Sequence, residues 1–184
     1  MTHEAPDVVI PLKKHNLIAM AIGAMVFVVV GGWLWSVAET QPAVNPRIVK
    51  VVSLASIGFF GACAIYLVRK LFDPRPGLIV DGDGIVDHSS AAAVGRIAWA
   101  DVTNVKINSI AGQEFVTIEV ADPKKYTARG GFLSRKLHAA NVRLTGSPIN
   151  ISANLLPVTL DEVMQTVAVK RARHRALARG GEAD

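Results

Sequence analysis

Two long uncharged apolar runs occupy the first part of the chain. They cover Leu17–Ala38 and Val51–Val68, and the segment between them contains two prolines and has the composition of a turn. Each run is long enough to cross a hydrocarbon core of about 30 Å as an α-helix. The pattern predicts a transmembrane helical hairpin over residues 17–70, preceded by an N-terminal tail at residues 1–16.

Lysine and arginine are distributed unequally around these runs, and cytoplasmic flanks carry the excess in membrane proteins. The outer flanks hold Lys13, Lys14, Arg69, Lys70 and Arg75, whereas the turn holds Arg47 and Lys50. The bias predicts that both termini are cytoplasmic.

An alternative interpretation of the first run is a signal peptide, because Ser36-Val37-Ala38 before Glu39 is similar to a cleavage site. The run is longer than the usual apolar region of about 7–15 residues, which favours a span. Neither run contains a charged residue, so we interpret the hairpin as an anchor and not as a transport pathway. Two pairs of small residues lie four apart, namely Ala19 with Gly23 and Gly58 with Ala62. They would allow the helices to approach closely, and the alternative is that small residues are simply common in membrane helices.

The pattern changes after a two-proline linker at residues 71–76. Short β-forming segments then alternate with turns, which predicts six or seven antiparallel strands in a domain over residues 77–184. The expected strands are Leu78–Val80, Ile85–Val86, Gly95–Trp99, Val102–Ile107, Glu114–Val120, Asn141–Thr145 and Ile149–Ser152. Phe132–Ala140 has the spacing of a short helix.

A capped helix is predicted at the C-terminal end. Thr159 and Glu162 have the spacing of a capping box, and an apolar face with helical period follows them. The helix is expected to run to about Ala178 and to stop at Gly180-Gly181. The predicted fold class is therefore α+β, with a transmembrane hairpin followed by strands that a C-terminal helix covers.

This order resembles the pleckstrin-homology (PH) arrangement, and the whole chain resembles an uncharacterised family of small bacterial inner-membrane proteins. The matching motifs are Pro76-Gly77-Leu78-Ile79-Val80, Gly84-Ile85-Val86-Asp87, Ile97-Ala98-Trp99-Ala100-Asp101-Val102 and Gly146-Ser147-Pro148-Ile149-Asn150-Ile151-Ser152, the last followed by Leu155-Leu156-Pro157. The resemblance implies a bacterial inner-membrane protein with a cytoplasmic PH-like domain. It implies no catalytic residues, because the motifs are turns and core positions.

The composition is typical of a membrane protein, and it bears on the kind of partner and on disulfide formation. Hydrophobic residues make up 51% of the chain and charged residues 19%, with a net charge of +5. A basic and apolar chain favours an anionic membrane surface over nucleic acid as its partner. Cys63 is the single cysteine, so no disulfide forms within the chain.

The motifs that could suggest catalysis or metal binding lack the residue spacing that these functions need. Asp81, Asp83 and Asp87 superficially resemble a calcium loop, but position 12 is Ala92 where an EF-hand needs a glutamate. The five histidines show no metal-ligand spacing, and adjacent residues at 87–89 cannot form a triad on one strand. We therefore expect no enzyme activity, no cofactor and no metal.

A basic segment at residues 122–140 interrupts the strands and is the candidate binding site. Its cations are Lys124, Lys125, Arg129, Arg135 and Lys136, with Tyr126, Phe132, Leu133 and Leu137 among them. Such a segment near a bilayer predicts contact with anionic lipid headgroups or a partner protein, and a solvated loop is the alternative. A second basic stretch ends the C-terminal helix: Lys170, Arg171, Arg173, His174, Arg175 and Arg179.

The sequence thus predicts a membrane-anchored, non-catalytic interaction module. Two other roles stay open, namely an immunity protein against a membrane-acting toxin and an accessory subunit of a larger membrane complex.

Overall fold

The computed structural model describes residues 6–40, 44–110 and 112–180. The chain forms two compact units. One is a helical hairpin, Lys14–Pro74, and the other combines Met1–Lys13 with Arg75–Asp184 and is called the β unit below. The hairpin is therefore inserted in the chain of the β unit.

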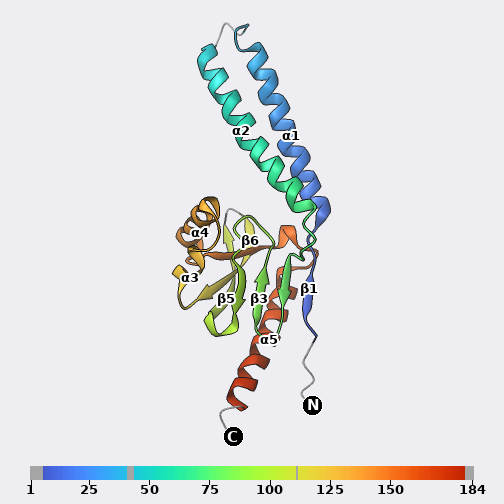
Figure 1. Ribbon diagram of the computed structural model, residues 1–184, viewed down its shortest axis with the longest axis vertical. Helices are drawn as coiled ribbons and strands as arrows, with labels where there is room; N and C mark the ends of the chain where they lie inside the picture. Colours follow the sequence, from blue (N-terminus) through green and yellow to red (C-terminus); the bar gives the residue numbers. More distant parts are fainter. Residues whose placement is uncertain (1–5, 41–43, 111, 181–184) are drawn as a thin grey trace. The chain divides into compact units, whose positions relative to one another are not determined.

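The hairpin consists of α1 (Lys14–Val37) and α2 (Pro46–Leu71) (Figure 1). Both helices are long and apolar enough to cross a membrane, and only 17% of the most apolar window of each is buried. A core helix of a soluble protein would be mostly buried, whereas most of the apolar surface of these two helices is exposed. The two predicted runs are confirmed as helices.

The two helices pack along a narrow seam. The buried residues of α1 are Leu17, Ala24 and Gly31, which recur at the seven-residue spacing of coiled-coil packing. A Cβ at Gly31 would lie 2.9 Å from Cγ1 of Ile57, so this glycine allows the close approach. The predicted contact through Gly23 and Gly58 is wrong, because a Cβ at either position would meet nothing within 4 Å.

The β unit contains two antiparallel sheets in the described part of the chain. The four-stranded sheet has the order β1 (Val8–Ile10), β2 (Leu78–Val80), β3 (Gly84–Asp87) and β4 (Gly95–Ala98). The three-stranded sheet has the order β5 (Val102–Ile110), β6 (Gln113–Val120) and β7 (Ile149–Ser152). A short 3-10 turn, η1 (Trp99–Asp101), joins the sheets, and η2 (Ala153–Leu155) follows β7.

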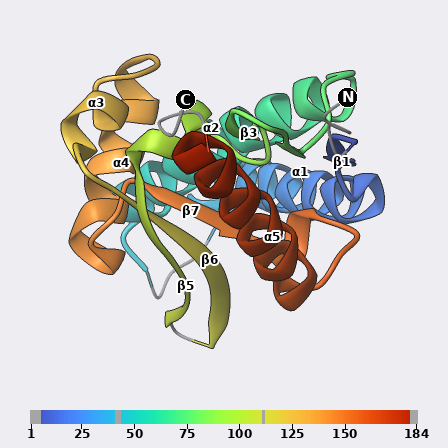
Figure 2. The same cartoon turned by 90° about the horizontal axis from the view of Figure 1, so that it is seen from below.

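The helix α5 (Leu160–Gly180) crosses the strands, as Figure 2 shows. Its start has the predicted capping box, since the Thr159 N–H donates to Oε2 of Glu162 (2.7 Å) and the Glu162 N–H donates to Oγ1 of Thr159 (3.3 Å). The helix ends at Gly180, close to the predicted end, and Gly181 lies outside the described residues. The helix and both sheets share one core, which includes Ile10, Leu78, Ile97, Val116, Ile151 and Val163.

Two elements differ from the sequence interpretation. β1 lies in the predicted tail and pairs with β2, with Ile10 opposite Leu78. Residues 141–145 are not a strand but the last part of α4 (Phe132–Thr145). Gly146 has φ +81° and its N–H caps the Val142 carbonyl, so the expected hairpin turn is a helix C-cap.

Candidate interaction surface on α3 and α4

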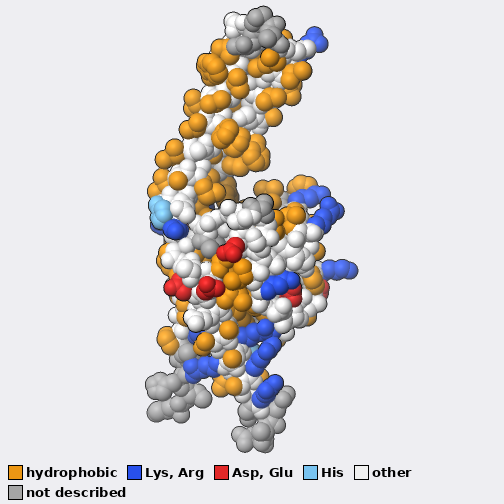
Figure 3. Space-filling model, turned by 180° about the vertical axis from the view of Figure 1, so that it is seen from behind, with side chains coloured by type: hydrophobic (Ala, Val, Ile, Leu, Met, Phe, Trp, Pro, Cys, Tyr) orange, Lys and Arg blue, Asp and Glu red, His pale blue; other side chains and the backbone are white. Residues whose placement is uncertain are grey.

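The basic segment folds as two short helices between β6 and β7. α3 spans Pro123–Thr127, and Oδ1 of Asp122 caps it by accepting the Lys124 N–H (2.9 Å). Gly130, with φ +79°, turns the chain into α4. Figure 3 shows Lys and Arg side chains gathered over this side of the β unit and along the C-terminal part of α5. Four of the five predicted site residues therefore lie on these two helices, and Arg129 lies in the turn between them.

Two of the five predicted cations hold α3 in place. Lys125 Nζ lies 2.5 Å from Oδ2 of Asp101. The Arg129 guanidinium donates to the carbonyls of Val94 (3.1 Å) and Arg96 (2.5 Å). It also lies 4.3 Å from the ring centroid of Tyr126. Lys125 and Arg129 therefore serve the fold, and the set available to a ligand is smaller than the sequence suggested.

Tyr126 forms the centre of this cluster. Its side chain is fully buried, and its hydroxyl donates to Oδ2 of Asp101 at 2.6 Å. Burial, followed by the bond to the Asp101 carboxylate, raises the pKa of Tyr126 to about 12. The pKa of Asp101 is lowered by the hydrogen bonds from Lys125 and then from Tyr126. The cluster fixes α3 against η1 through charge-assisted hydrogen bonds.

The other three predicted cations face solvent. Lys124, Arg135 and Lys136 are exposed, and no carboxylate among the described residues pairs with any of them. Lys136 Nζ lies 5.5 Å from the ring centroid of Phe132. Phe132 and Leu133 are 74% and 67% exposed. These five residues, Lys124, Phe132, Leu133, Arg135 and Lys136, are called the α3–α4 surface.

The exposure of Phe132 and Leu133 follows from how α4 packs. Its buried side chain is His138, whose Nε2 lies 3.1 Å from the Ala92 carbonyl. Ser134 Oγ, near the start of the helix, donates to the Ala91 carbonyl at 3.4 Å. Because α4 uses these polar side chains to contact residues 91–92, its large apolar side chains are left outside. Phe132 and Leu133 are therefore exposed apolar side chains on a helix that also carries the exposed cations Arg135 and Lys136.

The second basic stretch is largely structural. Arg171 donates to the carbonyls of Val102 and Thr103, and Lys170 Nζ donates to the Pro6 carbonyl at 2.8 Å. A ring nitrogen of His174 lies 3.1 Å from the Gly82 carbonyl. Burial, followed by the neighbouring charge of Arg175, lowers the pKa of Arg171. These contacts fasten α5 to the strands.

The aspartate-rich turn binds its own backbone. Asp81 Oδ1 accepts the N–H groups of Asp83 (3.0 Å) and Gly84 (2.9 Å), and Oδ2 pairs with Arg96 at 2.7 Å. Burial raises the pKa of Asp81, but the hydrogen bonds from Arg96 and the two N–H groups outweigh it, so the net shift is downward. Within the described ranges, no group of three or more His, Cys, Asp or Glu side chains that could hold a metal ion is found.

The serine beside Asp87 is also part of a turn. Asp87 Oδ1 accepts both the backbone N–H (2.8 Å) and the hydroxyl (2.7 Å) of Ser89. The hydroxyl is therefore directed at a carboxylate, and the bond from the Ser89 backbone N–H to the Asp87 side chain is that of an Asx turn.

Comparison with protein-family models, with curated proteins and with solved structures finds no match to this chain.

Proposed function

We propose that this protein is a membrane-anchored, non-catalytic interaction module, with two transmembrane helices and a cytoplasmic PH-like β unit. The exposed apolar surface of α1 and α2 supports the membrane anchor. Two antiparallel sheets of four and three strands with a C-terminal helix support a PH-like β unit. The sequence motifs support membership of the uncharacterised bacterial inner-membrane family.

The proposed orientation has both termini in the cytoplasm. The cations on the outer flanks of the hairpin outnumber the two at its turn. One of those two, Lys50, is paired with Glu39 at 2.6 Å and lies 5.7 Å from the Trp35 ring. A reporter fused after Asp184 that is active only in the cytoplasm is the expected result. Activity only in the periplasm would contradict the orientation.

The ligand we propose for the α3–α4 surface is the anionic headgroup region of a lipid bilayer. The observation that carries this proposal is the exposure of Phe132 and Leu133 beside three cations without carboxylate partners. The cores of protein interfaces are depleted in lysine, whereas interfacial membrane elements combine Lys and Arg with Phe and Leu. Each cation near an anionic surface contributes about 1 kcal/mol of attraction.

The test uses the full chain in lipid nanodiscs. We expect amide hydrogen exchange in α4 to slow when phosphatidylglycerol is added to phosphatidylcholine discs. The variant with Lys124→Glu, Arg135→Glu and Lys136→Glu should lose this protection. Lys125 is left unchanged, because its pairing with Asp101 would make a substitution destabilising.

The matched control reverses three other exposed cations, with Arg143→Glu, Arg175→Glu and Arg179→Glu. It changes the net charge by the same amount and should keep the protection of α4. Equal exchange in both kinds of disc would exclude lipid as the ligand of this surface. Loss of protection in both triple variants would show that only net charge matters.

A further inference from the structure

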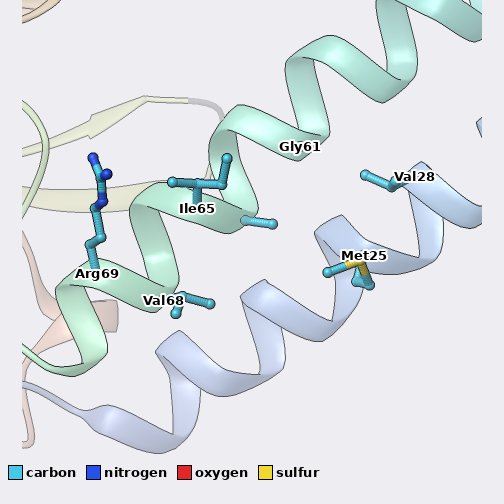
Figure 4. A pocket seen from close by; sticks show the side chains of 7 residues that line it. Met25, Val28, Gly61, Ile65, Val68 and Arg69 are labelled. Atoms are coloured by element: carbon cyan, nitrogen blue, oxygen red, sulfur yellow. The ribbon is translucent and has the colours of Figure 1, made fainter.

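An apolar groove runs between the two helices of the hairpin. Its volume is about 430 Å³, within the range of small-molecule sites. Figure 4 shows Met25 and Val28 directed from α1 toward α2, whereas Arg69, at one end of the lining, extends from α2 on the side away from α1. The α2 wall also includes Gly61, Ile65 and Val68. Gly61 contributes no side chain, which leaves the space open.

The groove has a charged residue at one end only. Its lining is almost entirely apolar, and the one cation of the lining, Arg69, is exposed near the C-terminus of α2. The next residue, Lys70, pairs with Asp73 at 3.0 Å, whereas no described carboxylate pairs with Arg69. A ligand that suits this lining has a long apolar part and one anionic group. A peptide fits poorly, because little in the lining can satisfy its backbone groups.

The length of the groove matches one leaflet of a bilayer. Gly61 precedes Arg69 by eight residues, which is about 12 Å along a helix. One leaflet contributes about 15 Å of a hydrocarbon core. Just beyond Gly61, the ring of Phe60 stacks on that of Phe27 with centroids 4.3 Å apart, so aromatic contact replaces open space there.

We propose that this groove binds one anionic phospholipid, with an acyl chain along Met25, Val28, Gly61 and Ile65 and the phosphate at Arg69. The site is separate from the α3–α4 surface and rests on the proposed function, since it requires the hairpin to span a bilayer. The lipid is held at a fixed position on the hairpin, as a bound molecule and not as bulk solvent.

The experiment measures retained lipid by native mass spectrometry on the delipidated full chain in detergent. Phosphatidylglycerol and phosphatidylcholine with the same acyl chains are titrated separately, and glycerol phosphate is added as a headgroup without chains. We expect retention of about one phosphatidylglycerol per chain, weaker retention of phosphatidylcholine, and no competition by glycerol phosphate.

Two substitutions test the two ends of the site. Arg69→Gln removes the charge, and Gly61→Leu fills the groove without a backbone clash, because a Cβ there meets nothing within 4 Å. Each should weaken phosphatidylglycerol binding about tenfold, the size expected for losing one charge-assisted bond or the chain contact. The controls are Arg47→Gln, at the other end of α2, and Gly58→Leu, which is equally open but does not line the groove.

The proposal is overturned if Arg69→Gln binds phosphatidylglycerol as the unchanged chain does, or if Gly61→Leu equals Gly58→Leu. It is also overturned if Gly61→Leu alone converts a dimer into a monomer, since the groove would then be an interface between copies. The variant with Lys124→Glu, Arg135→Glu and Lys136→Glu should retain the lipid. If carbonate extracts the chain from membranes, the proposed membrane anchor is wrong. This measurement does not depend on the lipid-binding measurements, so the two failures can be told apart.

Discussion

Neighbouring cations in α3 and in the turn after it have different roles, which depend on what lies opposite each side chain. Arg129 satisfies the carbonyls of Val94 and Arg96 and covers the Tyr126 ring. Lys124 is exposed and makes no such contact. We expect Arg129→Ala to lower the free energy of unfolding of the β unit by about 1–3 kcal/mol. Lys124→Ala should change it by less than about 0.5 kcal/mol.

Amide hydrogen exchange of β5 and β6 in the detergent-solubilised chain measures this difference. If Lys124→Ala destabilises the β unit as much as Arg129→Ala does, the division between structural and exposed cations is wrong.

Tyr126 gives a prediction about alkaline pH. Its pKa is about 12 in the folded chain, whereas an unfolded tyrosine titrates at about 10. Between these values the unfolded state has lost a proton that the folded state keeps, so stability falls as pH rises through this window. Below about pH 10 the contribution is fully present. Tyr126→Phe should remove this pH dependence.

The titration itself can be followed by tyrosinate absorbance. Tyr66→Phe leaves Tyr126 as the sole tyrosine, because the chain contains two. We expect an absorbance midpoint near pH 12 in the folded protein, and a midpoint near 10 would contradict the burial of the hydroxyl.

The residue types of the candidate site could be predicted from the sequence, but their roles could not. The basic segment stands out because five cations fall within a short stretch. Lys125 finds its partner at Asp101, 24 residues earlier, and Arg129 finds carbonyls still further away. Such pairings depend on the tertiary fold, which no local pattern contains. The exposed pair Phe132 and Leu133 was likewise compatible with a core position until α4 was seen to pack through His138.

At the scale of elements, the sequence predicts a helix end correctly where the capping residues fit only one structure. The capping box at Thr159 and Glu162 forms as expected, because its two hydrogen bonds involve residues three apart. The strand predicted at 141–145 is wrong, because Gly146-Ser147-Pro148 suits a hairpin turn as well as a helix C-cap. The sequence does not predict β1, because its partner β2 lies beyond the hairpin and no local turn marks the pairing.

β1 nevertheless contributes to the core, which gives a prediction with an internal control. Ile10 is 5% exposed and belongs to the core cluster, whereas its neighbour Val9 is 56% exposed. Ile10→Ala should destabilise the β unit by about 2–5 kcal/mol, since it removes buried methyl groups and leaves a cavity. Val9→Ala should change stability by less than about 0.5 kcal/mol. Hydrogen exchange in β2 and β3 measures both, and equal effects would mean that β1 does not dock as described.

On the scale of the whole molecule, the hairpin occupies the place of a loop between two paired strands. Ile10 of β1 lies opposite Leu78 of β2, so the chain leaves the sheet and returns to it at neighbouring positions. The Lys13 N–H donates to the Leu155 carbonyl at 2.9 Å, and the Gly77 carbonyl accepts from the His88 N–H at 2.9 Å. Both ends of the insertion are thus fastened to the β unit, and a long insertion at such a site costs little closure entropy.

This connectivity predicts that the hairpin can be exchanged for a short loop. Replacing residues 14–74 by a brief Gly-Ser connector should leave a β unit that folds in water without detergent, because β1, β2 and the core remain complete. The fragment 77–184, which lacks β1, should be much less stable, since the edge of β2 and the place of Ile10 are left open. Hydrogen exchange in β5 and β6 should match the full chain in the first protein and be faster in the second. If the connector version aggregates while the full chain is stable, folding of the β unit depends on the hairpin, and the two units are not independent.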